Sequence, residues 1–202
     1  IINCTFSGNS ASQHYGGAIY CSSSSPTVVN CLFSGNSANW DGGAIYCTYS
    51  SPTVTNCTFS GNEAKDSGTF GGNGGAIYCY NYSSPTLNNC ILWGNSAGNS
   101  GNEIYIEDSH SSCTLNYCCV NNTGYGGETG NITENNCIHS NPQFVDAANG
   151  DYHLQDTSPC IDAGANTLVP GAVGGDLDGN KRIVDGDNDG TATVDIGAYE
   201  KQ

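Results

Sequence analysis

A nine-residue motif recurs four times in the first half of the chain and constrains the fold more than any other feature. Its first copy reads Asn-Cys-Thr-Phe-Ser-Gly-Asn-Ser-Ala, and the copies occupy residues 3–11, 30–38, 56–64 and 89–97. A Gly-Gly-Ala-Ile-Tyr-Cys block separates them, at residues 16–21, 42–47 and 74–79. Self-similarity at a period of roughly 20–50 residues indicates a repeat architecture, in which each unit stacks on its neighbours.

The repeated cysteines set the size of one unit. They lie 27, 26, 33 and 28 residues apart, at Cys4, Cys31, Cys57, Cys90 and Cys118. Each unit holds three short apolar stretches that are rich in β-forming residues and too short for helices. The sequence therefore predicts an all-β, right-handed single-stranded parallel β-helix with coils of about 26 residues. A leucine-rich solenoid lacks its consensus here, and a propeller needs more strands per unit.

Stacked coils place equivalent residues above one another, about 4.8 Å apart. Two inward columns follow: Val28, Val54, Leu87, Leu115, and Phe6, Phe33, Phe59, Leu92. Two asparagine ladders follow as well: Asn3, Asn30, Asn56, Asn89, and Asn9, Asn36, Asn62, Asn95, Asn121. The first ladder is expected at a corner with left-handed backbone, which asparagine tolerates. The paired glycines allow a tight entry into the next strand.

Charge divides the chain into two parts. The net charge is −15, from 19 acidic and only 4 basic residues, and 16 of the acids lie from Glu103 onward. We expect the coils to occupy residues 1–140 and an acidic, loop-rich capping module, residues 141–202, to pack on the helix end. The lack of clustered Lys and Arg excludes a nucleic-acid partner. No apolar run is long enough for direct membrane insertion.

The two halves resemble known families. The Gly-Gly-Ala-Ile and Phe-Ser-Gly-Asn motifs resemble the repeats of chlamydial polymorphic outer-membrane proteins, and this resemblance implies a β-helical adhesin. Segments 141–144, 158–164 and 194–200 resemble the end module of secreted β-helix proteins of the choice-of-anchor type. That second resemblance implies a module that closes the helix and often precedes an anchor.

Twelve cysteines suggest an oxidising compartment. Eight follow the repeat and are expected to be reduced, packed side chains. Four break the repeat, and disulfides are expected among them with connectivity left open: Cys113, Cys119, Cys137 and Cys160. Because the chain contains no Met, we expect a targeting segment to have been removed and the protein to be extracellular or at the cell surface.

Alternating acids in the tail predict a structural calcium site. The run Asp-Gly-Asp-Asn-Asp-Gly at 185–190 is the first half of a calcium loop, but the acid expected at its twelfth position is replaced by Ile196. A second alternating run lies at 176–180. The candidate ligands are Asp176, Asp178, Asn180, Asp185, Asp187, Asp189 and Asp195. A solvated acidic turn region is the alternative.

Loop tips between the strands carry aromatic residues that suit contact with a glycan or a protein. One corner carries His14, Tyr15, Trp40, Asp41 and Phe70, and the opposite corner carries Tyr49, Tyr80 and Tyr82. Asn81, Asn121 and Asn131 fit the glycan-acceptor pattern. Capping of the core by these aromatics is the alternative.

No catalytic residues are predicted. The coils do not present two carboxylates on one strand face, as hydrolysis requires, nor a basic residue placed for lyase chemistry. We therefore expect an extracellular structural or adhesive protein, with self-association head-to-tail into a filament or a cell-surface glycan or protein as partner. A β-helix that binds or cleaves polysaccharide is the rival interpretation.

Overall fold

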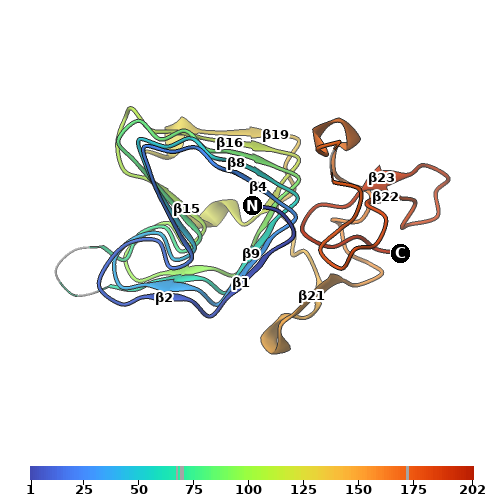
Figure 1. Cartoon of the computed structure of the whole chain (residues 1–202), viewed down its shortest axis with the longest axis horizontal. Helices are drawn as coiled ribbons and strands as arrows, with labels where there is room; N and C mark the ends of the chain where they lie inside the picture. Colours follow the sequence, from blue (N-terminus) through green and yellow to red (C-terminus); the bar gives the residue numbers. More distant parts are fainter. Residues whose placement is uncertain (67, 69–70, 172) are drawn as a thin grey trace.

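The computed structural model describes residues 1–66, 68, 71–171 and 173–202. Figure 1 shows a solenoid of nested coils at one side and a loop-rich module, drawn in orange and red, beside it. Each coil contributes one strand to each of three long sheets, so every pairing within the solenoid is parallel. The predicted parallel β-helix is therefore confirmed.

We name the sheets by a repeated residue. The phenylalanine sheet contains β1 (Thr5–Ser7), β5 (Leu32–Ser34), β9 (Thr58–Ser60), β13 (Ile91–Leu92) and β17 (Cys119–Val120). The tyrosine sheet contains β3 (Ile19–Ser22), β7 (Ile45–Thr48), β11 (Ile77–Tyr80), β15 (Ile104–Ile106) and β18 (Tyr125–Gly127). The threonine sheet contains β4 (Thr27–Val29), β8 (Thr53–Thr55), β12 (Thr86–Asn88), β16 (Cys113–Asn116) and β19 (Ile132–Asn135).

The remaining elements are short. A fourth sheet pairs β2 (Ser10–Ala11), β6 (Ser37–Ala38), β10 (Glu63–Ala64) and β14 (Ser96–Ala97). The module contains two antiparallel pairs, β20 (Phe144–Asp146) with β21 (Asp151–Leu154) and β22 (Ile183–Val184) with β23 (Thr193–Val194). Four 3₁₀ turns complete the chain: η1 (Asn122–Gly124), η2 (Thr129–Asn131), η3 (Ala147–Asn149) and η4 (Asn166–Leu168). Among the described residues, no helix has the length and apolarity to cross a membrane.

The interior consists of the predicted columns. Phe6, Phe33 and Phe59 stack with centroid separations of 4.8 and 4.5 Å and nearly parallel rings. Beside them, the valine and leucine column of the threonine sheet is fully buried: Val28, Val54, Leu87 and Leu115. Strand alternation turns every second side chain outward, so each sheet also carries a repeated residue on its outer face.

The tight corner between the threonine and phenylalanine sheets has left-handed backbone, as predicted. Asn30 and Asn89 both have φ near +49°, and Tyr117 takes the same conformation one coil further on. The amide ladder at this corner is only partly formed. Asn89 Nδ2 donates to Asn56 Oδ1 at 3.1 Å, whereas Asn30 Nδ2 turns to the carbonyl of Gly175 in the module.

The second asparagine ladder is continuous over four coils. Each Nδ2 donates to the next Oδ1 at 2.8 Å, along Asn9, Asn36, Asn62 and Asn95. The prediction that Asn121 is the fifth member of this ladder is wrong. Asn95 Nδ2 also donates to the Glu103 carboxylate at 2.6 Å, and Asn121 instead caps η1 by accepting from the Thr123 amide. A buried acceptor therefore replaces the next amide.

Paired glycines are required where the chain enters the tyrosine sheet. Gly42 has a φ of +72°, which side chains rarely adopt. A Cβ atom on Gly43 would lie 2.1 Å from the carbonyl oxygen of Gly75 in the next coil. Only glycine permits this contact between coils, as the repeat predicted.

The module does not pack where we expected it. It lies along the flank of the solenoid, against the Asn corner and the outer face of the phenylalanine sheet, rather than on the helix end (Figure 1). Ile91 and Cys119 point outward there and form a buried cluster with Leu154, Cys160 and Ile196. The equivalent positions of the first and third coils are Thr5 and Thr58, so the fourth and fifth coils place two apolar residues next to each other on this face. Covering them explains the lateral contact.

Candidate functional site

A ladder of tyrosines runs across the outer face of the tyrosine sheet. Ile and Cys of each strand point inward, so the tyrosine between them points outward. Tyr20, Tyr46, Tyr78 and Tyr105 stack with centroid separations of 5.2, 5.0 and 5.5 Å. Tyr20, at the end of the ladder, is 53% exposed, whereas Tyr46 and Tyr78 are 5% exposed. The middle rings of the ladder are therefore buried, and the ladder is accessible at its ends, where Tyr20 is exposed and Tyr105 is partly exposed.

An acidic hollow of about 550 Å³ adjoins this ladder. It is lined by Asp41, Asp66, Asn73, Tyr78, Asn99, Tyr105 and Glu107, with Gly68 and Gly71. Asp41 accepts two hydrogen bonds from Asn73, at 3.0 and 3.1 Å, and the Tyr78 hydroxyl donates to Glu107 at 2.7 Å. Burial raises the pKa of the Asp41 carboxyl, although the bonds from Asn73 oppose that rise. The hollow therefore offers carboxylates, amides and hydroxyls on one surface.

Sequence reasoning missed this set of carboxylates. We searched within single coils, but Asp41, Asp66 and Glu107 come from different coils and meet because the coils stack. Glu107 follows β15 directly, and its amide donates to the carbonyl of Cys79 in the preceding coil at 2.9 Å. The signal was present in the register of the fading fourth repeat, 102–106, which fixes the position of residue 107 beside β11.

Three of the predicted contact residues gather beside the ladder. The Tyr15 ring lies 5.0 Å from that of Trp40 and 4.3 Å from that of Tyr46, and His14 lies 5.8 Å from Trp40. Asp41, the next residue, is in the acidic hollow. Phe70 lies outside the described residues. This corner is therefore continuous with the tyrosine ladder.

The opposite corner holds a separate aromatic group. Tyr49 and Tyr82 are 55% and 61% exposed, with centroids 6.3 Å apart, and His110 continues the stack 4.6 Å from Tyr82. Tyr80 is 37% exposed. These side chains do not cap the core, contrary to the alternative considered from sequence.

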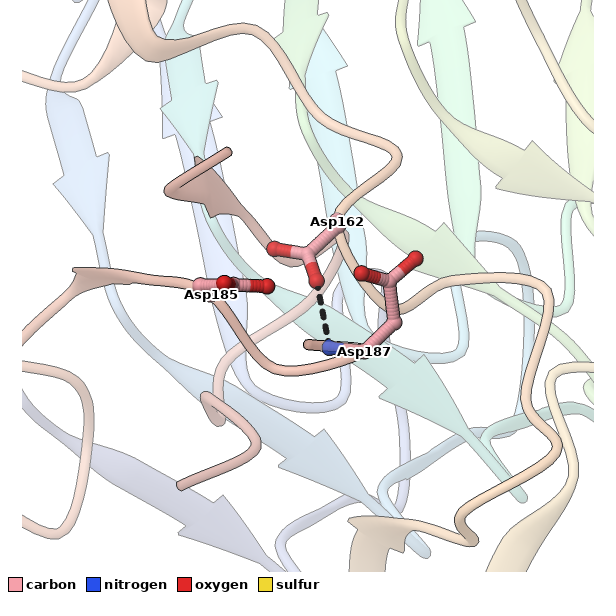
Figure 2. Close-up of side chains that lie close together, drawn as sticks. All are labelled: Asp162, Asp185 and Asp187. Carbon is pink, nitrogen blue, oxygen red and sulfur yellow. Dashed lines mark hydrogen bonds between the residues drawn. The ribbon is translucent and has the colours of Figure 1, made fainter. Parts of the chain in front are cut away.

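The predicted calcium ligands divide into two groups. Asp185 and Asp187 come together with Asp162, and one oxygen from each lies within 4.8 Å of the others (Figure 2). Asp162 was missed, because it lies in the 158–164 segment, more than twenty residues from the alternating run. Figure 2 shows Asp162 accepting a hydrogen bond from the Asp187 amide, at 2.8 Å.

The trio suits a hard cation. Three carboxylates at one point repel one another without a counter-ion, and calcium prefers such oxygen ligands. Asp162 Oδ1 is buried, and it has no hydrogen-bond partner among the described residues. Burial raises the pKa of Asp162. A bound cation would reverse that rise and satisfy the orphaned oxygen.

The other five predicted ligands lie elsewhere, because they close turns of the module. Asp176 accepts from the amides of Asp178, Asn180 and Glu200. Asp195 accepts from the amides of Asp162 and Lys201. Asp178 pairs with His153 of β21 at 2.8 Å, and Asp189 accepts from the nearby Thr191 amide at 2.7 Å.

A family model described as "Right handed beta helix region" matches residues 1–158. The chain belongs to this family. No curated protein and no solved structure matches the chain. The family contains both enzymes and non-enzymes, so membership establishes the right-handed coil and leaves the activity to be argued from the site.

All twelve cysteines of this β-helix carry free thiols in the structure. Cys137 does not break the repeat, because its thiol donates to the carbonyl of Leu115 as Cys118 does to that of Leu87 in the coil before. Cys113 is a fully buried interior residue. Cys119 and Cys160 instead meet where the module packs on the solenoid. The disulfide prediction remains, and the structure favours one pair for it.

The three glycan-acceptor asparagines are all half-buried. Asn131 Nδ2 donates to the carbonyl of Ser111 at 3.0 Å, and Asn121 Oδ1 accepts from Thr123. Asn81 lies at a corner with a φ of +49°. Modification of Asn131 would therefore break an existing hydrogen bond, and glycosylation at all three sites stays a prediction.

Proposed function

We propose that this β-helix is an extracellular adhesive protein that binds a glycan along the outer face of its tyrosine sheet. The observation that carries the proposal is the tyrosine ladder, Tyr20 to Tyr105, with the acidic hollow along its edge. Saccharides bind through many hydroxyl hydrogen bonds and through stacking on exposed aromatic rings. The hollow supplies the first, and Tyr20 with the His14–Tyr15–Trp40 corner supplies the second.

Charge narrows the class of glycan. The hollow contains Asp41, Asp66 and Glu107, and no basic side chain is among the described residues that line it. Together with the net charge of −15, this disfavours uronate-rich or sulfated polymers. The ligand we propose is a neutral or amino-sugar glycan.

Polysaccharide cleavage is the second candidate function. Asp41 is buried, with a raised pKa to which the charge of Glu107 contributes after burial itself. Glycoside hydrolysis uses two carboxyl groups in different environments, and the hollow brings the buried Asp41 together with Glu107. Release of reducing ends from neutral polysaccharides, abolished by Asp41→Asn and by Glu107→Gln, would favour this function over binding alone.

Two further proposals concern the rest of the molecule. Calcium at Asp162, Asp185 and Asp187 would hold the 158–164 and 185–190 loops of the module together. Head-to-tail stacking into a filament remains a separate proposal, which electron microscopy of the purified protein tests through the presence or absence of regular fibres.

A glycan array followed by calorimetry tests the main proposal. Asp41→Asn keeps the acceptor for Asn73 but removes the charge, and Tyr105→Ala removes one end of the ladder. Each is expected to weaken binding of the best neutral or amino glycan about tenfold or more. Tyr49→Ala, on the opposite corner, is the matched control and should leave binding unchanged. Equal losses in all three variants, or no glycan bound, would contradict the proposal.

A further inference from the structure

A second hollow, of about 620 Å³, lies between the solenoid and the module, away from the tyrosine sheet. From here on it is called the interface hollow. Ser60 and Trp93 line it from the solenoid, and Asn141, Gln143, Tyr152 and Gln155 line it from the module. Small-molecule sites in proteins are typically about 300–1,000 Å³ in volume, so the hollow is large enough for a short oligosaccharide.

Trp93 departs from the repeat at this place. The outward position that follows each phenylalanine is serine in the first three coils, Ser7, Ser34 and Ser60, and tryptophan in the fourth. The Tyr152 side chain of the module lies beside the serines of the second and third coils. Trp93 instead packs one side on the interface cluster and lines the hollow. A half-buried indole at a position where the fold needs only serine indicates a role beyond packing.

Three amide side chains line the same hollow as this indole, and each uses one half of its amide in a hydrogen bond within the protein. Gln155 Nε2 donates to the carbonyl of Phe144 at 2.8 Å, and Gln143 Oε1 accepts from Thr157 at 2.5 Å. Asn141 Oδ1 accepts from the backbone N–H of Gln143 at 2.8 Å. Within the described part of the chain, Gln155 Oε1, Gln143 Nε2 and Asn141 Nδ2 have no hydrogen-bond partner, so one acceptor and two donors remain for a ligand.

Among the described residues that line the interface hollow there is no carboxylate and no basic side chain, in contrast to the acidic hollow. Its polar atoms are neutral amides and hydroxyls, and its apolar surface is aromatic. An ionic ligand would lose its hydration without gaining a counter-charge. A neutral sugar ring, with hydroxyls at its edge and C–H groups on its face, matches both kinds of surface.

We propose that the interface hollow is a second glycan site, which binds a short neutral oligosaccharide with a sugar ring against Trp93 and its hydroxyls on Asn141, Gln143 and Gln155. The site depends on both parts of the chain, because the solenoid supplies the indole and the module supplies the amides. The interface hollow shares no lining residue with the acidic hollow, so either proposed site can be disproved while the other stands.

The two tryptophans allow ligand binding at the two sites to be followed separately by fluorescence. The chain contains only Trp40 and Trp93. In the Trp40→Phe protein all indole emission comes from Trp93 at the interface hollow, and in the Trp93→Phe protein it comes from Trp40 beside the tyrosine ladder. Each protein is titrated with cellohexaose, xylohexaose, mannohexaose and chitohexaose as probes, and with hexagalacturonate as the acidic comparison.

The expected result is a saturable emission change of Trp93 with at least one neutral probe and none with hexagalacturonate. Trp93→Ser, which restores the residue of the earlier coils and should therefore fold, and Gln155→Ala should each weaken calorimetric binding about tenfold in otherwise wild-type protein. Asp41→Asn in the Trp40→Phe background should leave the Trp93 response unchanged. A Trp93 emission that no neutral probe alters at millimolar concentration, or full binding retained by Trp93→Ser at this site, would overturn the proposal.

Discussion

Asn62 donates from Nδ2 to Asn95 Oδ1 over 2.8 Å, in the part of the asparagine ladder that is buried between coils. Asn62 also donates to the carbonyl of Phe33 and accepts from the backbone and side-chain nitrogens of Asn36. One side chain therefore satisfies polar groups of three coils. The ladder fixes the register of stacking as well as its stability.

Replacement of Asn62 by alanine should destabilise the β-helix by about 2–4 kcal/mol, because it leaves several buried donors and acceptors without partners. Asn9→Ala, at the exposed end of the same ladder, removes the same chemistry where water can replace it and should cost less than about 1 kcal/mol. Denaturant unfolding of the two variants measures the difference. Equal losses of unfolding free energy in the two variants would show that burial of the ladder does not determine its contribution to stability.

Glu103 ends this ladder, and its burial should make stability depend on pH. Burial raises the pKa of Glu103 from 4.5 to about 7, although hydrogen bonds from Asn95 and Gly94 oppose the rise. The folded state then binds the proton more tightly than the unfolded state, so stability is greatest below about pH 4.5 and falls as pH rises towards 7. The contribution of this group is of the order of 3 kcal/mol.

Glu103→Gln removes the titration and should flatten the stability profile between about pH 4.5 and 7. Glu63→Gln, on the exposed surface of the same coils, is the matched control and should keep the wild-type slope. Thermal unfolding at several pH values makes the comparison. A wild-type slope retained by Glu103→Gln would mean that other groups, such as Asp195, cause the pH dependence.

Calcium should stabilise the module through the Asp162 trio. A ligand that binds only the folded state stabilises it by RT ln(1 + c/Kd) at free concentration c, so the melting temperature rises with the logarithm of the calcium concentration once this exceeds the dissociation constant. Chelation with EDTA should lower the melting temperature of the wild type but not of Asp187→Asn. Asp189→Asn, in the same loop but outside the trio, should respond like the wild type. A wild-type melting curve that is the same with and without calcium would contradict the proposed calcium site.

Cys119 and Cys160 should form a disulfide under oxidising conditions. Both are fully buried in the cluster that joins the module to the solenoid. Oxidation by glutathione disulfide would join the two sulfurs and transfer their two protons and two electrons to the oxidant, which leaves as two glutathione thiols. Closure of this loop should stabilise the module by about 2–4 kcal/mol.

Peptide mapping without reduction identifies the pair. The expected product is a Cys119–Cys160 cross-link that Cys160→Ser abolishes and Cys137→Ser does not. Free thiols at both positions after oxidation, or Cys119 joined to another cysteine, would contradict the assignment.

The regular coils were predictable because equivalent residues of the repeat occupy the same environment in each coil. Phe33 and Phe59 stack in the structure for the reason that their positions coincide in the sequence, and the same register predicted the left-handed corner at Asn30. Where a coil departs from the repeat, the sequence pattern did not predict the contacts of its residues. Ladder membership of Asn121 failed because Glu103, one coil earlier, already accepts from Asn95.

The sites were less predictable because they join residues that are far apart in sequence. Asp41 and Glu107 face the same hollow only through stacking, and Asp162 joins Asp187 only through the fold of the module. The lateral position of the module was missed for a related reason. Outward apolar residues at Ile91 and Cys119 call for a cover, but the sequence pattern assigned Ile91 no role and suggested only a disulfide for Cys119.

A crystal structure of the protein with its best-bound neutral or amino glycan tests the central claim most directly. We predict density for sugar rings along the tyrosine sheet, with hydroxyls or amines on Asp41 and Glu107 and a ring near Tyr20 or Trp40. A tyrosine sheet free of sugar, in crystals where the bound glycan lies elsewhere on the molecule, would contradict it.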